Sequence, residues 1–188
     1  MEIRELELPE WEQIYENRMK EDFPENELKP FLAMKQMRQE GIYRAYGLKE
    51  ENELFAYWCM LSDQKEKTML LDYFAVRKDL RGQGYGRKVI QLLADTMNSG
   101  YTLFVESENP DGTKNAEERA LRERRIRFYQ SCGCNLLRMH SEIVSTPYRI
   151  FCISKEKNDE ETLKRRYLAL YRDVMLPKER FAGRVKVF

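Results

Sequence analysis

A short glycine-rich segment combines residue types that suit the binding of a phosphate group. The segment, residues 81–86, reads R-G-Q-G-Y-G and lies between an apolar strand pattern and an amphipathic helix pattern. Its alternating glycines permit backbone conformations that bring N–H groups around an anion. The start of the following helix adds unpaired N–H groups and the positive end of a dipole, and Arg81, Arg87 and Lys88 add charge. The segment therefore predicts a phosphate or pyrophosphate site.

Two common nucleotide-binding motifs do not fit this segment. The dinucleotide motif G-x-G-x-x-G, begun at Gly82, and the Walker A motif both require a glycine where the chain has Arg87. The order R-x-x-G-x-G after an apolar strand instead resembles the acetyl-CoA signature of the GNAT acetyltransferases, Q/R-x-x-G-x-G/A. A second resemblance is a helix that ends in Tyr129 and is followed by Gly133, although Cys134 stands where family members carry phenylalanine.

Hydrophobic periodicity and turn residues predict the elements around this segment. Helices are expected at 10–22, 27–39, 84–97, 114–131 and 159–175, and strands at 2–8, 42–49, 53–62, 68–76, 101–105, 135–139 and 148–153. This order indicates a mixed α/β domain of the α+β type around one sheet, and the resemblance implies a GNAT-like, mostly antiparallel, splayed sheet flanked by helices. We expect the domain to occupy residues 1–154. Residues 155–188 are then a helical extension, packed on the domain or at an interface.

The resemblance implies that acetyl-CoA is the cosubstrate and that no metal takes part. It assigns the cofactor site to Phe74, Val76, Arg81, Gly82, Gln83, Gly84, Gly86 and Arg87. In such enzymes the pantetheine arm lies along the strand that carries Phe74 and Val76, and the pyrophosphate lies on amides from residues 82–87. A backbone N–H near Phe74 then polarises the thioester carbonyl.

The resemblance also implies candidate catalytic residues. Tyr129 is expected to protonate the departing thiolate, because a phenol with a pKa of about 10 suits donation to a basic leaving group. The glutamate base of some histone-type members corresponds to Leu70 here. Glu106 and Glu108, at the end of the next strand, are the alternatives: one of them accepts the amine proton directly or through water, or both are ordinary solvated acids. Asp72 is a weaker candidate.

The chain departs from the family pattern before the helix that ends in Tyr129. Many members carry an asparagine about seven residues before that tyrosine, where this chain has Arg122. The segment 107–122 also looks longer than the family minimum, and a long loop beside an active site is often a lid or a specificity element. The charged residues of the helix favour a solvated face with i,i+4 pairs. The open alternative is that one arginine meets the CoA 3′-phosphate or an acidic substrate.

The composition limits the remaining function classes. A formal net charge of +1 argues against a nucleic-acid binder. No apolar run is long enough to span a membrane, and the acidic, alternating start is unlike a signal peptide, so we expect a cytoplasmic protein. A reducing compartment argues against disulfides among the four cysteines. Cys132, Cys134 and the single histidine, His140, lack the spacing of a zinc site.

Three function hypotheses follow. The first is an N-acetyltransferase that acts on a primary amine of a small molecule by direct attack in a ternary complex. The second is a protein or peptide N-acetyltransferase, and the third is a non-catalytic acyl-CoA-binding regulatory module. Retention of Tyr129 favours an enzyme, whereas Leu70 favours the third hypothesis or a different base. The apolar stripe of the last helix, with its basic surroundings, is expected to pack on the domain, or else to form a homodimer or partner surface.

Overall fold

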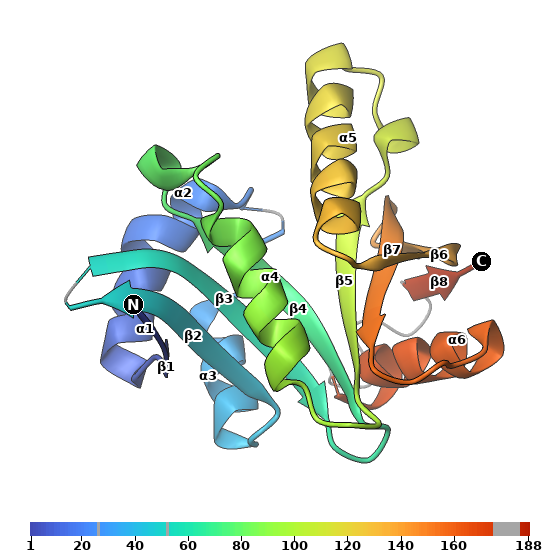
Figure 1. The fold of residues 1–188 in the computed structure, drawn as a ribbon, viewed down its shortest axis with the longest axis horizontal. Helices are drawn as coiled ribbons and strands as arrows, with labels where there is room; N and C mark the ends of the chain where they lie inside the picture. The colour runs from blue at the N-terminus through green and yellow to red at the C-terminus, as the bar shows by residue number, and fades with distance from the viewer. Residues whose placement is uncertain (26, 52, 175–184) are drawn as a thin grey trace. The chain divides into compact units, whose positions relative to one another are not determined.

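The computed structural model describes residues 1–25, 27–51, 53–174 and 185–188 of the chain. Two compact units are present (Figure 1): Met1–Leu61 with Asp72–Val89, and Ser62–Leu71 with Ile90–Phe188. The strand order is β1-β2-β3-β4-β5-β7-β6-β8. The α/β class and the mostly antiparallel sheet are thus confirmed. The splay expected beside β4 depends on how the two units lie and stays a prediction, as does a domain boundary at residue 154.

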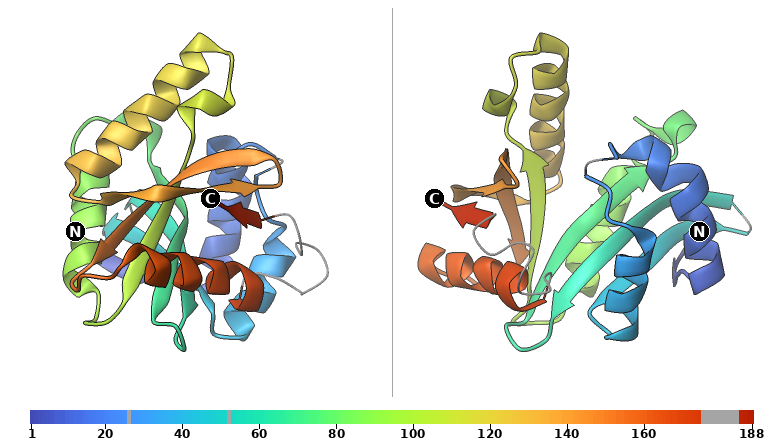
Figure 2. Two further views of the ribbon diagram at one scale, coloured as in Figure 1. Left: turned by 90° about the vertical axis from the view of Figure 1, so that its right-hand side faces the viewer. Right: turned by 180° about the vertical axis from the view of Figure 1, so that it is seen from behind.

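The first unit is built on the strands from β1 to the carboxyl half of β4. The strands are β1 (Glu2–Glu5), β2 (Tyr43–Glu50), β3 (Glu53–Asp63) and β4 (Thr68–Val76). The β1–β2 and β2–β3 pairs are antiparallel. The helical segments are α1 (Leu8–Ile14), the π-helical η1 (Tyr15–Met19), α2 (Lys20–Asp22), α3 (Phe31–Gln39), the 3-10 turn η2 (Lys78–Leu80) and the start of α4 (Tyr85–Thr96), whose residues from Ile90 onward belong to the second unit. Helices α1 and α3 lie on one face of β2 and β3, and the start of α4 lies on the other (Figures 1 and 2).

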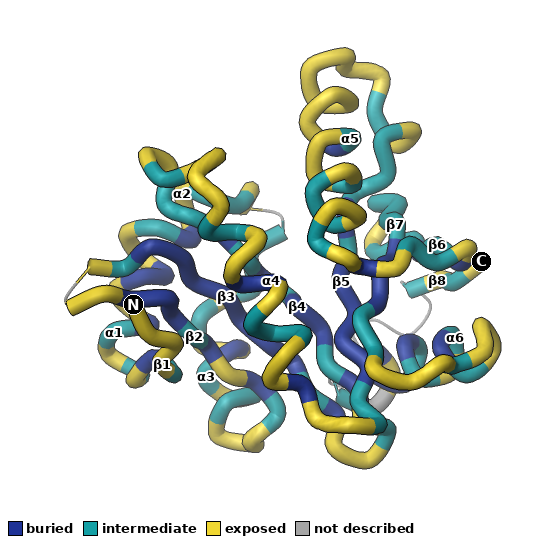
Figure 3. The backbone as a smooth tube through the Cα atoms, in the orientation of Figure 1, coloured by how far each residue is buried: buried dark blue, intermediate teal, exposed yellow. Residues whose placement is uncertain are grey.

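Aromatic side chains fill the core of the first unit. Trp11 of α1 is fully buried. Its ring stacks on Tyr43 of β2 at 5.8 Å between centroids and meets Phe31 of α3 edge-on at 5.2 Å. On β3, Trp58 is also buried and stacks on Tyr46 at 5.8 Å. Figure 3 shows this burial along the middle of β3. The aromatic stripes of the first helices are therefore core packing, as their spacing indicated.

Helix α3 begins at Phe31, so the expected start at Glu27 is wrong. Pro30 is the N-cap residue and has an extended ψ of 135°, and the residue before a proline is disfavoured in the helical region. The segment before Pro30 is a loop held by Tyr73 of β4. The Tyr73 hydroxyl accepts a hydrogen bond from the Lys29 amide at 2.9 Å and donates one to the Glu27 carbonyl at 2.8 Å.

The second unit joins the amino half of β4 to β5, β7, β6 and β8. Thr68–Leu71 of β4 pair in parallel with Thr102–Val105, and the other pairs are antiparallel. The strands are β5 (Thr102–Glu108), β6 (Asn135–Ile143), β7 (Thr146–Ser154) and β8 (Val185–Val187). The helical segments are the 3-10 turn η3 (Pro110–Gly112), α5 (Ala116–Ser131), α6 (Glu160–Ala169) and the π-helical η4 (Leu170–Val174).

The end of the chain differs from the expected single helix. Helix α6 begins after Asp159, whose carboxylate accepts a hydrogen bond from the Thr162 amide at 2.8 Å and so caps the helix. The expected helix of 159–175 becomes α6 and η4, and the expected stop at Pro177 lies outside the described residues. Strand β8, which pairs with β6, was not expected. No helix in the described part of the chain is long and apolar enough to cross a membrane.

Candidate functional site

The glycine-rich loop of the first unit is open and depends on glycine for its backbone conformation. Gly82 has φ of +80° and Gly84 has φ of +89°, which L-residues with side chains rarely adopt. A Cβ atom at either position meets nothing within 4 Å. Glycine is therefore required at both positions because φ is positive, and not because a side chain would clash with its surroundings. The loop 81–84 is exposed (Figure 3), so its backbone is accessible to a ligand.

Helix α4 begins directly after this loop, and the amides of its first turn adjoin the loop. Its first intrahelical hydrogen bond joins the Lys88 amide to the Gly84 carbonyl at 3.0 Å. The amides of Tyr85, Gly86 and Arg87 therefore precede the first helical hydrogen bond, and such groups favour an anion. The Tyr85 ring packs on Phe55 of β3 at 5.1 Å between centroids. This contact anchors the first turn of the helix on the sheet.

Arg81 shapes the loop with its own side chain. Its Nε donates to the Val76 carbonyl at 3.1 Å, and its Nη2 meets the Asp22 carboxylate at 2.8 Å. The Asp22 side chain is only 4% exposed. Gln83 similarly donates from Nε2 to the Asp79 carbonyl at 2.9 Å. These side chains hold the loop in shape, and Arg87 at the start of α4 is exposed.

Strand β4 places Phe74 and Val76 on one face, both half-buried. The recorded pairing of β4 with β5 ends at Leu71. In the first unit the carboxyl half of β4 is consequently the last strand in the order. Such a strand offers N–H and C=O groups to an added strand or an extended ligand. Phe74 and Val76 thus lie on a strand edge that leads directly into the glycine-rich loop.

Asp72 of β4 is engaged in a buried polar cluster. Its carboxylate accepts hydrogen bonds from Lys29 Nζ at 2.7 and 2.9 Å and from the Tyr43 hydroxyl. Burial raises the pKa of Tyr43 well above its ordinary value, and the Asp72 charge raises it further. Leu70, on the same strand, is fully buried. Leu70 therefore offers no carboxylate, and the Asp72 carboxylate is already bonded to Lys29 and Tyr43.

In the second unit, Glu106 of β5 is held by two tyrosines. The hydroxyls of Tyr167 in α6 and Tyr171 in η4 both donate to Glu106 Oε1. The Tyr167 oxygen also lies 2.9 Å from Ser141 Oγ of β6. Burial, followed by the charge of Glu106, raises the pKa of both tyrosines well above the ordinary value. Both hydroxyls therefore stay protonated and act as hydrogen-bond donors.

Glu108, two residues along β5, is neutralised by arginines of α5. Its Oε1 lies 2.5 Å from Arg122 Nη2 and its Oε2 lies 3.0 Å from Arg125 Nη1. Arg122 also meets the Glu118 carboxylate at 2.6 Å and the Asn109 carbonyl at 2.9 Å. Both oxygens of the Glu108 carboxylate are therefore engaged by guanidinium groups, and Glu108 links β5 to α5.

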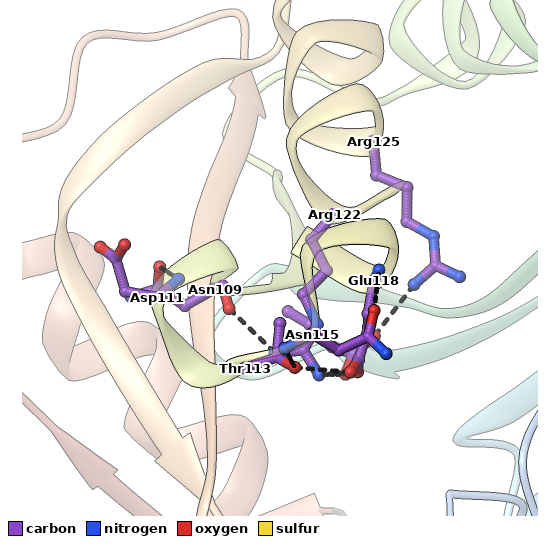
Figure 4. A network of polar contacts seen from close by, with 8 residues as sticks. Asn109, Asp111, Thr113, Asn115, Glu118, Arg122 and Arg125 are labelled. Atoms are coloured by element: carbon purple, nitrogen blue, oxygen red, sulfur yellow. Dashed lines mark hydrogen bonds and ion pairs between the residues drawn. The ribbon is translucent and has the colours of Figure 1, made fainter. Parts of the chain in front are cut away.

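The long segment before α5 is held by hydrogen bonds and by close packing. Asn109 accepts a hydrogen bond from the Asp111 amide at 3.1 Å, and Asn115 caps α5 by accepting from the Glu118 amide at 3.0 Å (Figure 4). A Cβ atom on Gly112 would come within 2.5 Å of Pro147. These contacts hold the loop before α5 in one conformation, and its role as a lid or a specificity element stays a prediction.

Tyr129 lies in the last turn of α5. Its ring packs on Phe128 and Phe151 at 5.1 and 5.5 Å between centroids, and burial raises the pKa of its hydroxyl. The carbonyl of Tyr129 accepts hydrogen bonds from the Cys132 and Cys134 amides, both at 3.1 Å. Gly133, with φ of +86°, permits this turn. Cys134 is buried where the family pattern has phenylalanine.

Tyr129 and Glu106 lie on opposite faces of the second unit's sheet. Tyr129 packs on Phe151, whose cross-strand partner in β5 is Val105, and such partners project from the same face. Since successive residues of a strand alternate between faces, Glu106 projects from the other face, where Tyr167 meets it. The candidate acid and the candidate base therefore lie on different sides of β5.

Three of the four cysteines, Cys59, Cys134 and Cys152, are buried, and Cys132 is partly exposed. Burial raises the pKa of Cys134 to about 12 and that of Cys152 to about 11. None of the four cysteines forms a disulfide. Within the described residues no group of three or more metal-ligating side chains occurs.

A family model, described as the acetyltransferase (GNAT) family, matches residues 2–134. The chain belongs to the GNAT acetyltransferase family. The match spans β1 to α5, and so it includes the glycine-rich loop, both glutamates and Tyr129 but not α6 or η4. Among curated proteins no match was found.

Solved structures share the fold of this GNAT protein. A GNAT-family protein from Bacteroides thetaiotaomicron has a TM-score of 0.73 at 14% identity, with 94% of this chain and 99% of that chain covered. The ribosomal-protein-S18-alanine N-acetyltransferase from Escherichia coli has a TM-score of 0.58 at 19% identity, with 84% and 97% covered. An aminoglycoside 6′-N-acetyltransferase complexed with coenzyme A has a TM-score of 0.63 at 14% identity, with 85% and 100% covered. At these identities the likeness establishes the fold alone.

Sequence reasoning missed Tyr167 and Tyr171, although both were visible in the apolar stripe of the last helix. A tyrosine at a core position carries a hydroxyl that needs a partner, and two tyrosines four residues apart lie on one helix face. That spacing was the available signal. Their common partner, Glu106, is set by tertiary packing and has no local signal.

Proposed function

We propose that this GNAT protein transfers an acetyl group from acetyl-CoA to a primary amine of a small molecule, by direct attack in a ternary complex. The observation that carries the proposal is the open loop at Gly82 and Gly84, which joins the edge of β4 to the first turn of α4. This cradle suits a long ligand with a pyrophosphate at one end and an extended amide-containing arm at the other.

The residues of the first unit have distinct roles in this proposal. Amides from Gly82 to Arg87 hold the pyrophosphate, and Arg87 adds a positive charge. Phe74 and Val76 offer backbone hydrogen bonds to the pantetheine arm, and an N–H near Phe74 polarises the carbonyl. Arg81 and Gln83 act by holding the loop in shape. When bound, acetyl-CoA supplies an acetyl thioester.

The residues of the second unit supply the proton transfers. Glu106 is the preferred acceptor of the amine proton, because both oxygens of Glu108 are occupied by Arg122 and Arg125. Tyr129 donates a proton to the departing thiolate. The raised pKa of Tyr129 keeps its hydroxyl protonated at neutral pH, as a general acid requires.

A second candidate function is an acyl-CoA-binding module without catalysis. The observation that favours it is Leu70 at the position of the family's strand glutamate, together with the engagement of Asp72 and Glu108 in ion pairs. Transfer to a protein or peptide amine is a third candidate, and it is separated from the first by the choice of acceptor.

Thermal unfolding with and without acetyl-CoA tests the cofactor site. Saturation at about 100 times the dissociation constant adds about 2.7 kcal/mol of stability, and NADH and ATP serve as controls. CoA release is then measured with kanamycin A, spermidine and a peptide with an amino-terminal alanine. In an enzyme, Tyr129→Phe lowers turnover and keeps the acetyl-CoA shift, whereas the control Tyr101→Phe changes neither. Without stabilisation by acetyl-CoA, the proposed site is wrong.

A further inference from the structure

The extension after residue 154 contributes two hydroxyl groups to a single carboxylate oxygen. Tyr167 and Tyr171 are four residues apart, so they project from the same side of α6 and η4. Both hydroxyls donate to Glu106 Oε1. The contact joins segments more than sixty residues apart in the chain. Neither tyrosine lies within residues 2–134, which the family model matches.

The cluster is buried and fixed by its packing. Tyr167 is 0% exposed and Tyr171 is 4% exposed. The Tyr167 ring meets Phe104 of β5 edge-on at 5.4 Å and the Tyr171 ring at 5.2 Å. Ser141 Oγ lies 2.9 Å from the Tyr167 oxygen. Because the single Tyr167 proton is donated to Glu106, the Ser141 hydroxyl is the donor to Tyr167. The chain of hydroxyls is therefore directed toward the carboxylate.

Phenylalanine would serve packing alone, and so the hydroxyls need a separate explanation. A buried hydroxyl is costly without a partner, and here both hydroxyls are directed to the carboxylate that the proposed chemistry uses. Two donors on one oxygen fix the rotamer of Glu106 and favour its ionised form over its protonated form. The fixed rotamer gives the carboxylate a defined direction, and the ionised form is the one that can accept a proton.

We propose that Tyr167 and Tyr171 are positioning residues for Glu106, which makes the carboxyl-terminal extension a working part of the active site. The inference rests on the proposed function, in which Glu106 accepts the proton of the amine. The extension then takes part in the reaction, and its role is not limited to packing or dimer formation. Its two hydroxyls orient the base and keep it ionised.

The groups around Glu106 support this role. From α6 and η4 it faces Tyr167 and Tyr171, and its cross-strand partner on β7 is the apolar Ile150. On its own strand Glu108 lies two residues away, with its charge balanced by the α5 arginines. Removal of a tyrosine hydroxyl therefore acts on Glu106 directly.

The test is the pH profile of kcat/KM for CoA release, with spermidine or kanamycin A as the acceptor. Tyr171→Phe should move the acidic limb to higher pH by about one unit, which is about a tenfold loss on that limb, because a hydrogen bond to the carboxylate is lost. The KM for acetyl-CoA should not change, since the glycine-rich loop is in the other unit. Tyr101→Phe is the matched control, because Tyr101 precedes β5 and is not a donor to Glu106.

A double-mutant cycle separates positioning from a general loss of stability. Glu106→Gln should lower kcat strongly, and Tyr171→Phe should have no further effect in the Glu106→Gln background. Near-ultraviolet circular dichroism and the acetyl-CoA thermal shift verify that each variant is folded. The variant Tyr167→Phe should reproduce the shifted limb independently.

The outcomes distinguish this inference from the proposed function. If the wild-type protein releases CoA and both Tyr→Phe variants keep its pH profile, the positioning role is wrong and the proposed function stands. The same conclusion follows if Tyr171→Phe lowers activity equally with and without the Glu106 carboxylate. If acetyl-CoA stabilises the wild-type protein but no acceptor leads to CoA release, the proposed catalysis fails and the positioning role fails with it.

Discussion

Arg122 provides a quantitative test of how the loop before α5 is held. Its side chain is only 7% exposed and contacts Glu108, Glu118 and the Asn109 carbonyl. Arg122→Met keeps the length of the side chain and removes the guanidinium group. Glu108, with 14% of its side chain exposed, then keeps Arg125 as its remaining cation among these contacts, and the Asn109 carbonyl loses its donor.

The expected loss in the free energy of unfolding is about 3 kcal/mol. Removal of one partner from a buried ion pair costs about 3–5 kcal/mol, while the pair with the half-exposed Glu118 contributes less than about 1 kcal/mol. The low end applies for two reasons. Arg125 continues to balance Glu108, and the substitution removes Arg122 Nε, which is buried with no partner among the described residues.

Urea unfolding followed by far-ultraviolet circular dichroism measures this loss, with the slope m compared between variants. Arg127→Met is the matched control, because Arg127 is 67% exposed and pairs with Glu123 at 3.6 Å. Its loss should be below about 0.5 kcal/mol. In the double variant Arg122→Met with Glu108→Gln, part of the stability should return because the buried charge is gone. A loss below about 1 kcal/mol for Arg122→Met, at unchanged m, would refute the reasoning.

Three further predictions concern other parts of the chain. Gly84→Ala should cost about 1–2 kcal/mol of stability because of the positive φ at this position, and it should reduce the thermal shift with acetyl-CoA. The control is Gly41→Ala, also at positive φ with open space around it, which should cost as much and leave that shift intact. An unchanged shift in Gly84→Ala would contradict the site. Tyr73→Phe should lower the free energy of unfolding by about 1–2 kcal/mol in urea, because two backbone groups lose their hydroxyl partner; no loss would contradict that contact. The pKa of Cys134 is raised to about 12 and that of Cys152 to about 11, so their stabilisation is complete below the unfolded-state value of about 8.5 and declines as the pH rises toward 11. Urea unfolding at pH 8 and pH 10.5 should show this decline in stability. If the decline persists in the double variant Cys134→Ala, Cys152→Ala, other groups cause it.

The glycine-rich site could be predicted from the sequence because its signals are local. The strand 68–76 was expected at the bounds that β4 has, since alternating apolar residues between polar turns define it. The start of α4 was placed within one residue by the glycines before it. The conformations of Gly82 and Gly84 follow from the same local logic. Pro30 was an equally local signal, and the expected start of α3 at Glu27 overlooked it.

The arrangement of the candidate base could not be predicted, because it depends on distant segments. Glu106 and Glu108 are alike in sequence, yet one meets two tyrosine hydroxyls and the other meets two guanidinium groups. Strand β8 likewise owes its conformation to pairing with β6, and three residues alone carry too little pattern to predict it. Such features are decided by which segments pack together.

Two departures from the family pattern bear on which carboxylate acts as the base. Arg122 occupies the position where many members carry asparagine, and its guanidinium group engages Glu108. Leu70 removes the strand glutamate of histone-type members. The proposed base is Glu106, and its hydroxyl partners come from residues beyond the family match. In this proposal the base lies on β5 and is oriented from the carboxyl-terminal extension. Neither part of the chain is then expected to function without the other.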